Sequence, residues 1–147
     1  MSLLNQEQIK EIIPHRDPFL LIDEVLEMEA GVSIVAQKTL KKDEFWFKGH
    51  FPNQPVQPGV LTMEMLAQAG AVCILSLPEN KGKIGFLAGI DKAKFRGMAF
   101  PGDVLRLELT IIKVRGAIGI GNGTAYVGDK KIASAEIKFA LQDPQNA

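Results

Sequence analysis

The sequence has one cysteine and no excess of either charge. Cys73 has no second cysteine with which to form a disulfide, and it lies in an apolar run where a free cysteine usually packs as a small hydrophobic side chain. Seventeen basic and seventeen acidic residues give a formal net charge of zero, which argues against the positive field of a nucleic-acid-binding protein. We therefore expect a cytoplasmic protein that meets any charged partner through a local patch.

Signals for export and for metal or nucleotide binding are also missing. The N-terminal residues MSLLNQEQIKEII lack the basic, apolar and small-residue regions of a secretory signal. The two histidines, His15 and His50, lie far apart and show no ligand spacing with Cys73. No helical pattern follows the glycines of GIGNGTAYVG, so they do not form a nucleotide-binding loop. We expect no metal and no cofactor.

The longest apolar stretch, residues 59–77, approaches the length of a membrane span. It carries Glu64, Gln68 and Ser76, and alternating strand patterns with charged residues follow it. These features favour a helix buried on all sides of a globular domain over a helix that crosses a membrane.

Hydrophobic patterns predict strands on both sides of this helix. A short helix is expected over residues 5–13, with Asn5 and Gln8 forming a capping box. Three prolines and two glycines make residues 47–59 an irregular loop. A helix apolar on all sides is best covered by a curved sheet wrapped around it, so we expect one α+β domain over residues 1–147. The predicted antiparallel strands are residues 20–29, 32–41, 84–96, 104–115, 117–127 and 131–141.

Two titratable side chains lie close to the start of the buried helix. His50 belongs to the irregular loop, where the backbone can direct its ring into a pocket. Glu64 is the only charged residue between Pro58 and Pro78. Because an unpaired carboxylate is costly to bury, Glu64 has either a specific partner or a chemical task. Gln68, one helical turn later, lies on the same face and can hold the Glu64 side chain.

The start of the helix adds a group that can bind an oxyanion. The first N–H groups of a helix point outward with partial positive charge, and Gly59 lets a ligand approach the backbone closely. A carbonyl oxygen that gains negative charge is stabilised by such groups. A structural interpretation stays open, in which His50 bonds to a backbone carbonyl and Glu64 bonds across an interface.

The sequence resembles the hot-dog-fold 3-hydroxyacyl-(acyl-carrier-protein) dehydratases of the FabZ type in three blocks, HRDPFLLIDEV, GHFPNQPVQPGVLTMEMLAQ and FLAGIDKAKFR with FPGD after it. The resemblance covers about residues 15–141. It implies that (3R)-3-hydroxyacyl groups on acyl carrier protein are dehydrated to trans-2-enoyl groups in type II fatty acid biosynthesis. It also implies that His50 and Glu64 are the catalytic pair, contributed to each site by different subunits of a dimer, often within a trimer of dimers.

The resemblance assigns further residues and leaves others in doubt. Phe86 matches an aromatic position at the acyl tunnel of the family, although plain core lining is the favoured interpretation, and it joins Gly59 and Gln68 as an expected substrate-binding residue. His15 falls in the N-terminal block and is interpreted as architectural. Gln57 stands where methionine is common in the family, and Gly97 with Met98 replaces a more usual basic and proline pair.

Three other functions stay open at this point. A related dehydratase that also isomerises the double bond differs by an aspartate at the position of Glu64. A thioesterase would use a carboxylate and water to hydrolyse the same thioester, and His50 paired with Glu64 favours elimination instead. An acyl-binding module without catalysis would have no use for a buried acid. Which of the two residues protonates the leaving hydroxyl is also open.

A basic stripe is expected on one strand. Alternation in DKAKFR puts Lys92, Lys94 and Arg96 on one face of residues 84–96. An ordinary solvated strand face explains this pattern as well as a function does. The functional interpretation is that the stripe attracts the acidic surface of acyl carrier protein.

Overall fold

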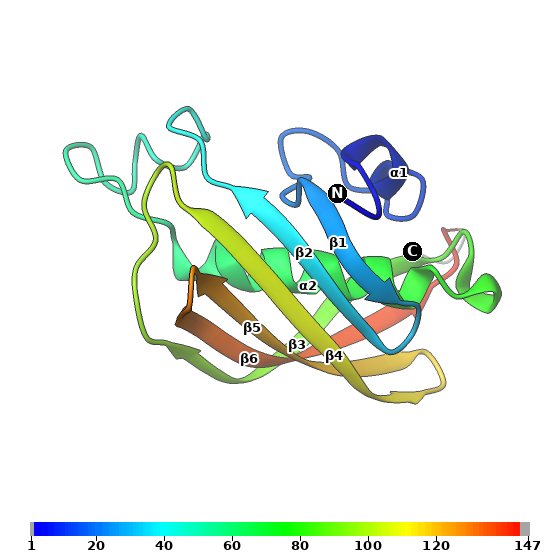
Figure 1. Cartoon of the computed structure of the whole chain (residues 1–147). Helices are drawn as coiled ribbons and strands as arrows, with labels where there is room; N and C mark the ends of the chain where they lie inside the picture. The colour runs from blue at the N-terminus through cyan, green and yellow to red at the C-terminus, as the bar shows by residue number, and fades with distance from the viewer. Residues whose placement is uncertain (1, 145–147) are drawn as a thin grey trace.

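The computed structural model describes residues 2–144, in which one long helix lies across a curved antiparallel sheet (Figure 1). The strand order in the sheet is β1-β2-β4-β5-β6-β3, and every pairing is antiparallel. The predicted α+β class is confirmed. In chain order the elements are α1 (Gln6–Lys10), β1 (Glu24–Glu29), β2 (Ser33–Thr39), α2 (Gly59–Leu75), a short 3-10 turn η1 (Pro78–Asn80), β3 (Ile84–Phe95), β4 (Val104–Arg115), β5 (Ile118–Val127) and β6 (Lys130–Gln142).

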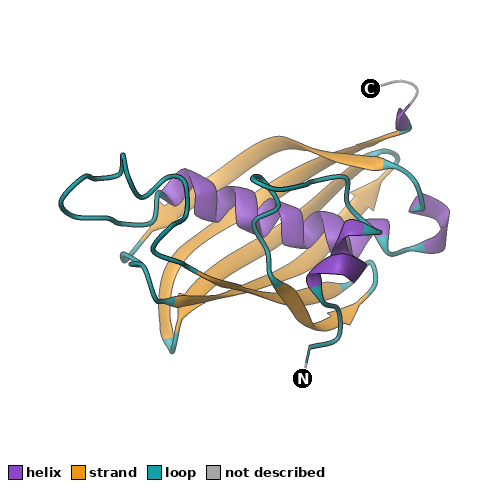
Figure 2. Ribbon diagram, turned by 90° about the horizontal axis from the view of Figure 1, so that it is seen from above, coloured by secondary structure: helices purple, strands orange, loops and turns teal. Residues whose placement is uncertain are grey.

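The sheet curves around α2, which lies in its concave face (Figure 2). Every residue of α2 from Thr62 onward is buried except Glu64. Cys73 packs in this core as a fully buried free thiol, as the sequence predicted. The expectation of a buried helix is confirmed, and no helix in residues 2–144 combines the length and the apolar character needed to cross a bilayer.

Close approach between α2 and the sheet depends on glycine. A Cβ built on Gly70 of α2 would lie 2.2 Å from Cζ of Phe139 on β6. On the facing strand β5, a Cβ at Gly123 would lie 3.3 Å from the methyl groups of Leu66. The absence of these side chains lets the helix settle deep in the curve of the sheet, which brings Glu64 near the strands.

The N-terminal segment differs in part from the prediction. α1 is capped by Asn5 and Gln8 as expected. The strand predicted from residue 20 begins only at Glu24. At Leu21 the N–H donates to Oε1 of Gln68 on α2, 2.9 Å away, so the backbone is engaged by the helix, and bonding to β2 starts only with the N–H of Asp23. The prediction of a strand over residues 20–23 was therefore wrong.

The two edges of the sheet are unlike one another. At the β1 edge, the N–H groups of Leu3 and Leu4 donate to the carbonyl oxygen of Val25 over 2.7 and 3.1 Å. At the other edge β3 is twice as long as β1 and mostly exposed. Its pairing with β6 is interrupted by irregularities between Leu87 and Gly89 and between Asp91 and Lys94. The β3 edge is therefore the open one.

Candidate active site

His50 lies in the loop between β2 and α2, which extends beyond the sheet at the end where α2 begins (Figure 1). Its Nδ1 is 2.8 Å from the carbonyl oxygen of Val56, and its ring stacks on Phe51 with centroids 4.0 Å apart. A carbonyl oxygen only accepts hydrogen bonds, so in this geometry Nδ1 carries a proton. In the neutral ring Nε2 then keeps its lone pair, which is the tautomer that a base acting through Nε2 needs.

Glu64 is held by Gln68, as the helical spacing predicted. Nε2 of Gln68 donates to Oε2 of Glu64 over 3.0 Å and to the carbonyl oxygen of Phe19 over 2.9 Å. Its Oε1 accepts from Leu21, so the buried amide of Gln68 is fully engaged and rigidly placed. No hydrogen bond from residues 2–144 reaches Oε1 of Glu64, and this oxygen is available to a ligand.

His15 is a neighbour of Glu64 that the sequence did not reveal. Its Nε2 lies 3.7 Å from Oε2 of Glu64, and its Nδ1 is buried with no hydrogen-bond partner in residues 2–144. Burial lowers the pKa of His15 below its usual value, with a smaller lowering by Arg16, while the charge of Glu64 opposes the shift. These two residues are 49 positions apart, and no spacing rule joins a segment before a strand to a helix face.

A narrow cavity between α2, β3 and β6 contains both side chains. Its walls mix the polar groups of His15, Glu64 and Gln68 with apolar or small residues, namely Ala67, Ala71, Gly85, Leu87 and Phe139. At about 20 Å³ this cavity has room for about one water molecule, so in the single chain it fits a hydroxyl beside the Glu64 carboxylate and not an acyl chain. His50 does not line this cavity, and no hydrogen bond or ion pair among residues 2–144 joins His50 to Glu64.

The start of α2 exposes a backbone donor, as the sequence predicted. The helix begins at Gly59 without a side-chain cap. The N–H groups of Leu61 and Thr62 already donate to Pro58, whereas the N–H of Gly59 has no acceptor in residues 2–144. A Cβ at Gly59 would lie 2.5 Å from the ring of Phe95, at the end of β3. A side chain at this position would therefore displace the ring of Phe95.

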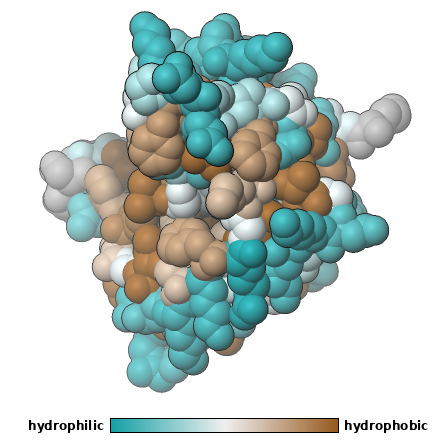
Figure 3. Space-filling model, turned by 90° about the vertical axis from the view of Figure 1, so that its left-hand side faces the viewer, coloured by the Kyte–Doolittle hydropathy of each residue, from teal (hydrophilic) through white to brown (hydrophobic). Residues whose placement is uncertain are grey.

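The end of the molecule that carries these groups is apolar. Seen from that end, hydrophobic side chains gather in the middle of the face and hydrophilic ones surround them (Figure 3). The segments that meet there expose Phe51, Val60, Phe95 and Met98, and Val60 on the first turn of α2 is 74% exposed. An exposed apolar patch of this kind marks a contact surface.

Phe86 lies on β3 and is 42% exposed. In the single chain Phe86 is therefore not part of the core. It is next to Leu87, which lines the cavity of Glu64, and its place on the open edge strand leaves a role beside the substrate as a prediction.

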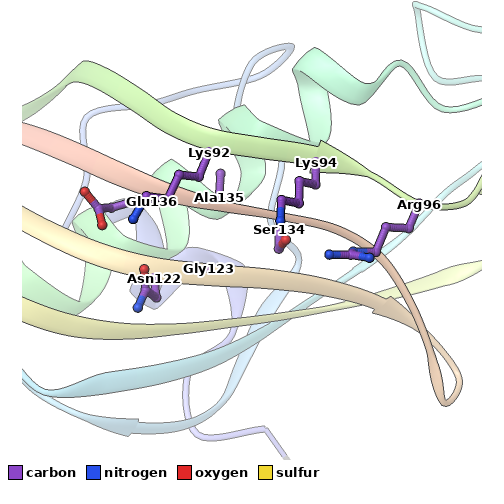
Figure 4. A pocket seen from close by; sticks show the side chains of 8 residues that line it. All are labelled: Lys92, Lys94, Arg96, Asn122, Gly123, Ser134, Ala135 and Glu136. Carbon is purple, nitrogen blue, oxygen red and sulfur yellow. The ribbon is translucent and has the colours of Figure 1, made fainter.

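The three basic residues at and just after the end of β3 lie together as predicted, although not by regular alternation. Lys92, Lys94 and Arg96 border one shallow hollow over β5 and β6, together with Asn122, Gly123, Ser134, Ala135 and Glu136 (Figure 4). The strand contains a bulge at this point, with Lys92 at a φ of 55°, so the regular alternation is interrupted. All three side chains are exposed, and one acidic residue faces them.

Comparison with known families gives one match over most of the chain. Residues 13–136 match the FabA-like domain. The chain is 57% identical over 137 residues to the 3-hydroxyacyl-(acyl-carrier-protein) dehydratase FabZ of Clostridium kluyveri, covering 93% of this chain and 95% of that protein. It is 51% identical to the enzyme of the same name from Oceanobacillus iheyensis, covering 95% and 100% of the two chains. The enzyme of Clostridium tetani is 55% identical, with 96% and 99% covered.

Solved structures share the arrangement of helix and sheet. The dehydratase heterocomplex ApeI:P from Xenorhabdus doucetiae superposes with a TM-score of 0.80 at 17% identity, covering 93% of this chain and 92% of that one. The virulence protein Cj0977 from Campylobacter jejuni gives a TM-score of 0.70 at 13% identity, with 97% and 96% covered. At such low identity these likenesses concern the fold alone, and they confirm the expected hot-dog arrangement.

Proposed function

This chain belongs to the family of FabA-like domains and is a 3-hydroxyacyl-(acyl-carrier-protein) dehydratase of fatty acid biosynthesis, and we propose that His50 and Glu64 carry out its chemistry. The observation that carries the proposal is the lone pair left on Nε2 of His50, because the bond from Nδ1 to Val56, which a purely structural histidine would also make, fixes the tautomer that a base needs. The second observation is the clamp of Gln68 on Glu64, which leaves one carboxylate oxygen open.

The elimination needs a base, an acid and a site for negative charge. Nε2 of His50 removes the proton on C2 of the 3-hydroxyacyl thioester, and the electron pair moves towards the thioester carbonyl. The N–H of Gly59 stabilises the carbonyl oxygen as it gains charge. The C3–O bond then breaks, and the hydroxyl leaves as water with a proton from Glu64 or from the protonated ring of His50. The products are the trans-2-enoyl thioester and water.

Two copies of the chain are needed to assemble this site. Glu64 shares its cavity with Gly85 and Leu87 near the start of β3, whereas Gly59 packs on Phe95 at the end of β3. Antiparallel pairing of two β3 edges puts the end of one strand beside the start of the other. The loop of His50 and the start of α2 from one copy then approach Glu64 of its partner. The exposed apolar end of the molecule is buried in the same step, and three such dimers form the larger assembly.

Acyl carrier protein is the macromolecule that delivers the substrate. Its docking surface is the hollow bordered by Lys92, Lys94 and Arg96. Charges of this kind steer an acidic partner and set its orientation more than they add affinity. We place the enzyme in the cytoplasm as a single domain over residues 1–147, since its one cysteine is a free thiol and its buried apolar side chains form one cluster.

Two variants test the assignment of the pair. His50→Ala and Glu64→Gln each lose more than about a hundredfold in turnover, because each removes a proton-transfer group. Purified protein is assayed on 3-hydroxyacyl carrier protein, and the enoyl product, the position of its double bond and any free thiol are followed. Glu79→Gln, an exposed carboxylate on η1, is the matched control and keeps full activity.

The same assay separates the rival reactions. Near wild-type dehydration by a folded His50→Ala or Glu64→Gln protein would remove that residue from the mechanism. Release of free thiol in place of enoyl product would mark a hydrolase.

A further inference from the structure

A buried polar cluster lies behind the loop that carries His50. Nε1 of Trp46 donates to Oε1 of Gln57 over 3.0 Å. Nε2 of Gln57 in turn donates to Oγ1 of Thr62 over 3.3 Å, and it lies 3.9 Å from Sδ of Met65. All four side chains are buried. The cluster joins two positions of the loop to the first turns of α2.

The cluster encloses the segment on which the geometry of His50 depends. Trp46 precedes His50 and Gln57 follows it, and Val56, the acceptor for Nδ1 of His50, is the neighbour of Gln57. The N–H of Gln57 also donates to the carbonyl oxygen of Ala99 over 2.8 Å. Within residues 2–144, Gln57 makes the only side-chain hydrogen bonds between this loop and α2. The side-chain amide of Gln57 therefore links the loop to α2.

The buried indole N–H of Trp46 requires a hydrogen-bond acceptor at position 57. An indole N–H only donates, and when it is buried it needs an acceptor. Gln57 supplies that acceptor and has its own amide protons engaged by Thr62. An apolar side chain at position 57 fills the same space but leaves the N–H of Trp46 buried and unpaired. The indole then moves to find another partner, and the loop moves with it.

We propose that Gln57 is a positioning residue for His50, which holds both arms of the loop on α2 through Trp46 and Thr62 and so keeps the carbonyl oxygen of Val56 against Nδ1 of the ring. The proposal rests on the proposed function, in which His50 is the base. It adds a residue that touches neither substrate nor reacting atoms, and it gives the buried pair of Trp46 and Gln57 a part in the chemistry.

A double-mutant cycle tests the proposal. Gln57→Met keeps the length of the side chain and removes its hydrogen bonds, and we expect kcat to fall about 10- to 100-fold with a much smaller change in KM, because a misplaced base costs rate and not binding. Trp46→Phe removes the donor. The double variant Trp46→Phe/Gln57→Met lacks the same hydrogen bonds, so its kcat stays within about threefold of Gln57→Met alone and the two effects are not additive.

A second readout follows the hydrogen bond itself. Trp46 is the only tryptophan of the chain, so its indole N–H gives one resonance in a ¹⁵N spectrum. The full-length wild-type protein protects this proton from exchange with solvent, and Gln57→Met loses the protection. Gln37→Met is the matched control, because the Gln37 amide bonds to Glu24 on the neighbouring strand, away from the loop. It leaves both kcat and the exchange of the indole proton unchanged.

Each result either supports or contradicts the positioning role of Gln57. A folded Gln57→Met protein with wild-type kcat but an unprotected indole proton would overturn the proposal, and so would a double variant that regains wild-type kcat. If Gln57→Met does not fold, Thr62→Val replaces it, and its kcat must fall severalfold for the proposal to stand. His50→Ala is assayed beside them. Loss of turnover there with none in Gln57→Met leaves His50 as the base and rejects only the role of Gln57.

Discussion

His15 and Glu64 share a cavity in which a charged imidazole is disfavoured. Burial is the largest cause of the lowered pKa of His15, and it outweighs the attraction of the Glu64 carboxylate. Nε2 nevertheless lies within 3.7 Å of that carboxylate. The ring of His15 is therefore uncharged beside Glu64 at neutral pH. Its protonation at lower pH decreases the free energy of unfolding.

The first prediction concerns this decrease. The folded pKa of His15 lies below its usual 6.5, so the unfolded chain binds more protons once the pH falls below that value. The free energy of unfolding therefore decreases as the pH falls from about 6.5, and His15→Gln shows a shallower decrease over the same window. Urea unfolding of both proteins at several pH values measures the difference. Parallel curves for the two proteins would show that His15 does not titrate differently on folding.

Gly70 shows what the contact between α2 and the sheet demands. Alanine at this position raises helix propensity by about 1 kcal/mol. Its Cβ would lie 2.2 Å from Cζ of the buried Phe139, and overpacking of this kind costs about 1–3 kcal/mol. We expect Gly70→Ala to be destabilised on balance, and Gly70→Ala/Phe139→Leu to recover part of the loss.

Denaturant unfolding tests this balance, with Gly49→Ala as the control because no atom lies within 4 Å of a Cβ there. A Gly70→Ala protein more stable than wild type would mean that the ring of Phe139 gives way easily. Such a result would also mean that α2 and β6 are not packed as tightly as the distances indicate.

Elements were predictable from the sequence where one local pattern decides them. The strand β4, the cap of α1 and the start of α2 depend on alternation, on a capping box and on the Pro58-Gly59 pair. The strand predicted from residue 20 failed because Gln68, 47 positions from Leu21, engages its backbone. Side chains that meet across the fold leave no trace in a local pattern.

The candidate site divides in the same way. The clamp of Gln68 on Glu64 follows from helical spacing and was predicted. The approach of His15 to Glu64 and the bond from Trp46 to Gln57 were not, since each joins segments whose relative placement is set by tertiary packing. The bulge in β3 could not be predicted from the sequence either, because a β-bulge depends on the pairing strand as much as on the residues in it.

The pairing of two copies leads to a prediction about mixed protein. His50→Ala and Glu64→Gln are each inactive when pure. In a mixed dimer one site loses both groups and the other keeps both, so equal mixing with free exchange restores about a quarter of wild-type activity. The assay follows turnover after the two proteins are unfolded and refolded together. Mixed dimers shown to form but to lack activity would place His50 and Glu64 of one site on the same chain.

The docking hollow leads to a prediction about salt and substrate. Reversal of Lys94 and Arg96 to glutamate raises KM for the carrier-bound substrate and weakens its salt dependence, because steering by charge is lost. A short thioester on a small neutral carrier is affected little. The control reverses Lys113 and Arg115, a pair of exposed basic residues at the end of β4. Equal losses on both substrates would make the stripe structural, and no loss on either would place docking elsewhere.

The difference between the two sheet edges decides what kind of assembly is possible. A subunit with two open edges can add neighbours without limit, which is how fibrils grow. Here Leu3 and Leu4 bond to Val25 alone, so they cover one position near the start of the β1 edge, whereas no strand in residues 2–144 pairs with the outer edge of β3. Pairing through a single edge about a twofold axis uses up that edge on both copies and stops at two. Under the proposed pairing of two β3 edges, the N-terminal segment reduces the part of the β1 edge that a further strand could use.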